Sequence, residues 1–141
     1  MAERAGHCSI SDNGDWANQN VVFVRALEDM FPLAKTILQG ALARDECRGA
    51  HYKPEFAMPS VDADQPAEQR RQAAAWCKQF DENNRKWLKT TVASLDGEGE
   101  PKLTYEDVDT SLISPRPRLY GVVGGQVIEQ VWKERQADSS R

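Results

Sequence analysis

The sequence lacks any apolar run that approaches the roughly 20 residues of a membrane-spanning helix. Its first residues, from Met1 to Arg4, are polar and contain no apolar signal core. We therefore expect a protein that is neither exported by a standard signal nor inserted in a membrane, and we place it in the cytoplasm.

The sequence also lacks a basic excess, because 18 Lys and Arg residues stand against 22 Asp and Glu residues, for a net charge of −4. Nucleic-acid-binding proteins usually carry a strong positive excess, so this composition argues against nucleic acid as a partner. Cysteine is sparse and odd in number, with Cys8, Cys47 and Cys77. Without a secretory signal, this pattern favours reduced thiols.

Motifs for cofactors and metals are missing too. The glycine cluster at 121–125 does not have the G-x-G-x-x-G spacing of a dinucleotide loop. Cys47 and His51 are four residues apart, but no second Cys/His pair supplies the remaining ligands of a zinc site. Cys77 lies beside Trp76 and is expected to be a buried structural thiol. We predict no catalytic, cofactor or metal site within this segment.

The strongest pattern that is present indicates a long helix from about Trp16 to Arg48. Apolar residues recur there at spacings of three and four, and Gly49 is a natural terminator. Pro32 removes one hydrogen bond inside it, so we expect either a kinked helix or two abutting helices. Many of its apolar residues lie outside the main stripe, and such a helix tends to be buried on several sides.

Shorter elements follow this helix, after an irregular lead-in over residues 1–15. Proline-rich residues 51–66 predict a loop, and residues 67–84 predict a second helix with Pro66 in its first turn. Two β-prone runs within 90–108 predict a hairpin that turns at residues 96–101. A final short helix is expected over 126–135, with a disordered tail over 136–141. The fold class is therefore mostly α, a small helical bundle with a β-hairpin.

Residues 43–52 are unusually dense in charge, with two arginines, two acids and a histidine. One interpretation is a polar network that locks the helix end against a neighbour. The other is a solvated helix C-terminus, where surface ion pairs contribute little. Composition alone leaves both interpretations open.

The same stretch carries a family resemblance. Residues 43–56 read A-R-D-E-C-R-G-A-H-Y-K-P-E-F. They resemble the A-R-x-E-S-R-G-A-H-x-R-x-D-F signature of the flavoprotein subunit of succinate dehydrogenase and fumarate reductase. Further matches follow in the family's order: residues 84–91 are similar to D-x-x-W-L-K-H-T, 95–99 to Y-R-D-G-E-G, 103–105 to L-S-Y, and 117–120 to the family's basic, tyrosine-ending tail.

The resemblance covers residues 16–120 and implies the C-terminal helical domain of that subunit, with residues 121–141 as an additional helix and tail. Cys47 stands where serine is usual, Lys53 where arginine is common, and Thr90 where histidine is common. The segment around residues 62–75 lengthens the link to the second helix.

The resemblance implies that the intact subunit interconverts succinate and fumarate and passes electrons from FAD to an iron–sulfur subunit at the inner face of a membrane. The family's FAD-binding domain and its dicarboxylate-binding residues lie upstream, and no residue here matches them. The implied partners are that upstream domain and the iron–sulfur subunit, with the membrane reached only through partner subunits. Five residues are structural or interface candidates: Arg44, Glu46, Arg48, His51 and Trp87.

Two other hypotheses stay open at this point. In the first, the chain is a freestanding helical adaptor without an enzymatic role. It also resembles the C-terminal domain of L-aspartate oxidase, although the R-G-A-H context and the hairpin favour succinate dehydrogenase.

Overall fold

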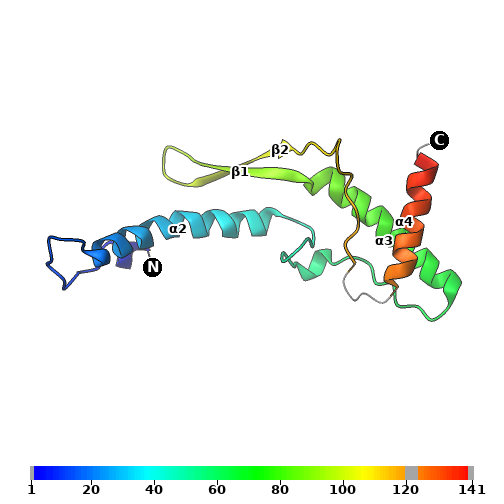
Figure 1. The fold of residues 1–141 in the computed structure, drawn as a ribbon, viewed down its shortest axis with the longest axis horizontal. Coiled ribbons are helices and arrows are strands. Elements are labelled where there is room, and N and C mark those ends of the chain that lie inside the picture. The colour runs from blue at the N-terminus through cyan, green and yellow to red at the C-terminus, as the bar shows by residue number, and fades with distance from the viewer. Residues whose placement is uncertain (1, 120–123, 140–141) are drawn as a thin grey trace. The chain divides into compact units, whose positions relative to one another are not determined.

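The computed structural model describes residues 2–119 and 124–139, and Figure 1 shows the order of their elements along the chain. The structure confirms a small, mostly α fold with one β-hairpin. The elements are α1 (Ala2–Ala5), α2 (Gln19–Ala43), a 3-10 turn (Pro54–Phe56), α3 (Pro66–Trp87), β1 (Lys89–Leu95), β2 (Pro101–Asp107) and α4 (Gly125–Ser139). Across the described ranges, no helix combines the length and the apolar character that crossing a membrane requires.

The chain divides into two compact units, each built from two separate segments. The first unit contains Met1–Arg44 and Thr91–Glu106, and the second contains Asp45–Thr90 and Asp107–Arg141. The first unit therefore holds α1, α2 and most of the hairpin, while the second holds α3 and α4.

Helix α2 is a single helix that runs through Pro32, which resolves the choice between one helix and two. It begins at Gln19 because the Asn18 side chain accepts hydrogen bonds from the backbone N–H groups of Asn20 and Val21. It ends at Ala43, and not near Gly49 as expected, because Arg44 adopts an extended conformation. The signature after residue 44 therefore lies outside the helix.

No residue of α2 is buried, although the helix is rich in apolar side chains. The exposed large apolar residues of this helix are Val21, Val22, Phe23, Leu27, Met30, Leu33, Ile37, Leu38 and Leu42. A soluble helix normally buries such a face, so α2 presents an apolar surface that its own unit does not cover.

The hairpin confirms the expectation for residues 90–108. Asp96 organises its turn, because the Asp96 carboxylate accepts hydrogen bonds from the backbone N–H groups of Glu98 and Glu100 at 2.9 and 2.7 Å. Gly99 takes a positive φ of 80° there, a conformation that glycine adopts without steric cost. Within the same unit, Lys35 of α2 forms an ion pair with Glu100.

The core of the second unit lies between α3 and α4, which cross one another in Figure 1. Its buried members are Val61, Ala73, Cys77, Ile128, Val131 and Trp132. Helix α3 begins at Pro66, as expected, and continues to Trp87 instead of ending near Asn84.

Two expectations for the chain ends were wrong. The irregular lead-in contains the short helix α1, and the final helix continues through Ser139, so residues 136–139 are helical instead of disordered. Residues 140–141 of the expected tail lie outside the described residues.

Candidate functional site

The R-G-A-H part of the signature forms a tight two-residue turn. The backbone N–H of Arg48 donates to the His51 carbonyl at 3.0 Å, and the N–H of His51 donates to the Arg48 carbonyl at 3.1 Å. Gly49 is the first residue of the loop and has a φ of 60°. Glycine is favoured at this position because side chains crowd the backbone in the left-handed region. Gly49 therefore makes a turn and does not end a helix.

Glu46 and Arg48 form a two-pronged ion pair. The Arg48 Nε donates to Glu46 Oε1 and the Arg48 Nη2 donates to Glu46 Oε2, both at 2.9 Å. Glu46 is fully buried, whereas the Arg48 side chain is 30% exposed. A buried carboxylate that accepts two hydrogen bonds differs from a solvated surface pair. The pair forms a polar network, but it lies in the loop after α2 and not, as the first interpretation held, at the end of that helix.

Helix α3 completes this network from the other side. The same Arg48 Nη2 donates to the Asn84 side-chain oxygen at 2.9 Å. The Arg48 guanidinium carbon also lies 5.9 Å from the centre of the Phe80 ring, within the range of a cation–π contact. We refer to Glu46, Arg48, Phe80 and Asn84 as the arginine network.

A second set of contacts holds the chain next to this network. Lys53 Nζ donates to Asp45 Oδ1 at 2.6 Å, and this hydrogen bond lowers the pKa of the Asp45 carboxyl below its ordinary value. The Cys47 sulfur contacts both the backbone N–H and the carbonyl of Lys53, at 3.3 and 3.2 Å. Cys47 therefore makes local backbone bonds of the kind a serine hydroxyl makes, which fits a structural thiol.

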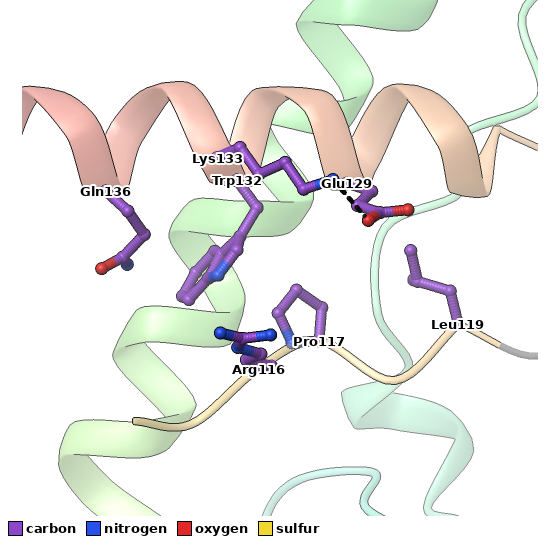
Figure 2. Close-up of a pocket in the computed structure, with 7 residues that line it drawn as sticks. All are labelled: Arg116, Pro117, Leu119, Glu129, Trp132, Lys133 and Gln136. Carbon is purple, nitrogen blue, oxygen red and sulfur yellow. Dashed lines mark ion pairs between the residues drawn. The ribbon is translucent and has the colours of Figure 1, made fainter. Parts of the chain in front are cut away.

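Two cavities lie close to these residues within the second unit. One, of about 390 Å³, is lined by Arg48, Trp76, Phe80, Arg116 and Arg118 among others. Figure 2 shows the other, of about 470 Å³, between α4 and the extended segment at residues 116–119. Lys133 and Glu129 pair across one turn of α4 at its edge, at 2.8 Å. As a pair of opposite charges, they add no net charge to this rim.

The structure brings together some of the five candidate residues. Glu46 and Arg48 pair directly, and His51 joins Arg48 through the backbone. Arg44 follows the last turn of α2 in the first unit, where its N–H donates to the Gly40 carbonyl. Trp87 ends α3 and is buried, with the Lys86 ammonium 4.7 Å from its ring centre. Their structural or interface role stays a prediction.

Sequence reasoning missed Asn84 and Phe80 as members of the arginine network. Asn84 is the first residue of the segment that resembles D-x-x-W-L-K-H-T, and this position in the motif could have marked it as a candidate. Phe80 lies in the segment predicted as the second helix, and its apolar side chain alone gave no signal of a contact with Arg48. Across the described ranges, no group of three His, Cys, Asp or Glu residues is placed to hold a metal ion.

Comparisons with known proteins bear on the resemblance. The family described as fumarate reductase flavoprotein C-term matches residues 1–120. A succinate dehydrogenase flavoprotein subunit from Bacillus subtilis (strain 168) is 36% identical over 121 residues, which is 85% of this chain and 17% of the relative. Fumarate reductase flavoprotein subunits from Escherichia coli (strain K12) and Proteus vulgaris are 26% and 27% identical, each over 86% of this chain and 17% of the relative.

No solved structure matches the chain. The chain spans about one sixth of the length of these curated relatives. The family match covers most of the chain, including the arginine network, the hairpin and α3. The chain therefore belongs to the C-terminal family of succinate dehydrogenase and fumarate reductase flavoproteins.

Proposed function

We propose that this segment is the structural and assembly part of a flavoprotein subunit that interconverts succinate and fumarate. The observation that carries the proposal is the closed pairing of the signature, in which both oxygens of the buried Glu46 carboxylate accept hydrogen bonds from Arg48. A carboxylate engaged in this way is a poor general base, but it fixes the position of the arginine. The network thus suits a role in holding two chain segments together.

The intact protein, in this proposal, oxidises succinate or reduces fumarate and exchanges electrons between FAD and an iron–sulfur subunit. The names of the relatives support succinate and fumarate over the aspartate oxidase alternative. The iron–sulfur subunit would bring the protein to the inner face of the membrane from the cytoplasm.

FAD belongs, in this proposal, to the part of the subunit outside this segment. The residues described here do not fit it, because β1 and β2 form a hairpin around an Asp96 turn. A dinucleotide fold instead places a glycine-rich loop between a parallel strand and a helix. We expect the purified segment to bind no flavin, and a flavin absorbance band on it would contradict this.

The exposed apolar face of α2 supports the assembly role. Residues such as Leu33, Ile37 and Leu42 are 60 to 75% exposed in this segment, which spans 17% of the relatives' length. Burying each large apolar side chain contributes about 1.5–3 kcal/mol. We propose that the remainder of the longer polypeptide covers this face.

The test is Arg48→Ala in the full-length subunit. Removing the bidentate partner of a fully buried carboxylate should cost about 3–5 kcal/mol of stability. We expect a lower melting temperature and less assembled complex, while the chemical step of the assembled fraction is unchanged.

Arg71→Ala is the matched control, because Arg71 makes the same two-pronged bond to Glu68 but is 79% exposed. Its effect should stay below about 1 kcal/mol. Loss of the chemical step in Arg48→Ala with normal melting and assembly would overturn the proposed role.

A further inference from the structure

Helix α4 lies beyond the residues that match the family, yet it supplies half of the core of the second unit. The family match ends at residue 120, and α4 runs from Gly125 to Ser139. Ile128, Val131 and Trp132 of α4 are all buried against α3 and the loop before it. Helix α4, which lies outside the family match, therefore packs on α3, which lies inside it.

Two ion pairs link α4 to α3. Arg135 Nη2 donates to Asp81 Oδ2 at 2.5 Å, and Arg70 forms an ion pair with Glu134. These two pairs join successive residues of α4 to positions eleven residues apart on α3. The two pairs add to the apolar burial that holds α4 on α3.

The fixed position of α4 places Trp132 against the arginine network. The Trp132 ring meets the Phe80 ring edge-on, with centroids 5.2 Å apart and an interplanar angle of 84°. Phe80 stacks on Trp76 at 5.4 Å and 12°, and it also lies under the Arg48 guanidinium. Edge-on and stacked pairs are the favourable geometries for aromatic rings, so Phe80 is restrained by two of them.

We infer that Trp132 is a positioning residue for the Arg48–Glu46 pair. Trp132 restrains Phe80, and the Phe80 ring provides the surface on which the Arg48 guanidinium lies while it binds Glu46 and Asn84. The extension beyond the family match is therefore part of the site that the signature forms. For its consequence in assembly this inference rests on the proposed function, but the coupling between Trp132 and Arg48 does not.

The first experiment measures the Arg48 Nε–H signal by nuclear magnetic resonance in the 141-residue chain, with Leu33→Glu and Ile37→Glu present throughout to limit self-association through the exposed apolar face of α2. Trp132→Leu keeps an apolar side chain but removes the ring edge, and it should shift and broaden this signal. Trp132→Phe keeps a ring and should largely restore it. The Arg71 Nε–H, which bonds Glu68 away from α4, serves as the internal control and should not move.

The second experiment is a double-mutant cycle on the folding equilibrium constant. Trp132→Leu and Arg48→Ala should be non-additive by about fivefold, whereas Trp132→Leu and Arg71→Ala should be additive. Trp132→Met, which keeps more of the side-chain volume, takes the place of Trp132→Leu should that variant fail to fold.

An unchanged Arg48 signal together with additive energies would overturn the inference and leave α4 as packing alone. A measured coupling combined with normal assembly of the full-length Arg48→Ala subunit would instead reject the proposed function and leave the inference standing.

Discussion

A substitution of Gly49 tests whether the R-G-A-H turn needs glycine for its backbone conformation. Nothing lies within 4 Å of the position that a Cβ would take there, so only the φ of 60° opposes a side chain. We expect Gly49→Ala to lower the free energy of unfolding by about 1–2 kcal/mol, measured by urea denaturation. Gly97→Ala is the control, because Gly97 also has open space and has no positive φ.

The control should change stability by less than about 1 kcal/mol, because alanine fits the open space and restricts the unfolded chain. Equal losses in both variants would show that the Gly49 turn carries no special strain.

Cys77 gives a pH dependence at the residue scale. Burial raises the pKa of the Cys77 thiol, so the folded state holds this proton to higher pH than the unfolded state does. Its contribution to stability is therefore intact below the ordinary thiol value of 9.0 and is lost as pH rises above it. The loss has a limiting slope of about 1.4 kcal/mol per pH unit.

The measurement compares urea unfolding at pH 7 and pH 10 for the parent chain, Cys77→Ala and Cys8→Ala. Only Cys77→Ala should flatten the pH dependence, because Cys8 is exposed. A parent slope that survives in Cys77→Ala would assign it to other groups.

At the scale of elements, the start of α4 depends on a close backbone approach. A Cβ on Gly124 would lie 2.5 Å from both the Val61 carbonyl oxygen and its side chain, and Gly124 has a φ of 80°. We expect Gly124→Ala to lower the free energy of unfolding by more than about 2 kcal/mol, because strain and overlap add. Thermal unfolding followed by tryptophan fluorescence measures it.

The neighbouring Gly125→Ala is the matched control, because its Cβ would meet Leu119 at an ordinary 3.7 Å. Alanine also favours the helix that begins there, so this variant should be neutral or stabilising. A Gly124→Ala variant as stable as the parent would show that the start of α4 does not pack closely against Val61.

Local patterns in the sequence predicted the elements well, because spacing and turn chemistry act over a few residues. The apolar periodicity predicted α2 and α3, and the Asp96 turn predicted the hairpin. The predicted end of α2 was wrong because Gly49 is equally suited to a helix terminus and to a two-residue turn. Only the extended conformation of Arg44 distinguishes the two.

The candidate site was predicted less completely, because its contacts join distant parts of the chain. Glu46 and Arg48 stood out by charge density, but the network also includes Asn84 of α3, which lies 36 residues from Arg48 along the chain. Phe80 is linked to Trp132 of α4 in the same way, across a long stretch of sequence. No periodicity encodes which apolar face meets a particular arginine.

At the scale of the whole molecule, α2 predicts how the isolated chain behaves. Its exposed apolar side chains would forfeit several kcal/mol of burial, a large part of a domain's margin of about 5–15 kcal/mol. We expect the isolated chain to self-associate and to bind a hydrophobic dye. Leu33→Glu with Ile37→Glu should reduce both, as measured by light scattering and dye fluorescence.

Leu112→Glu is the control for added charge, because Leu112 is 95% exposed but lies outside α2. It should leave self-association unchanged. A sharply melting monomer that binds no dye would show that the chain covers this face by itself, and would favour the freestanding adaptor.

The division of each unit into two segments has a consequence for the growing chain on the ribosome. Helix α2 is complete at Ala43, but the hairpin that shares its unit is complete only at Asp107. About 64 residues separate these points, and a ribosome adds roughly 5–20 residues per second. The first unit is therefore complete only about 3–13 seconds after α2, and the nascent chain is open to chaperones for that interval.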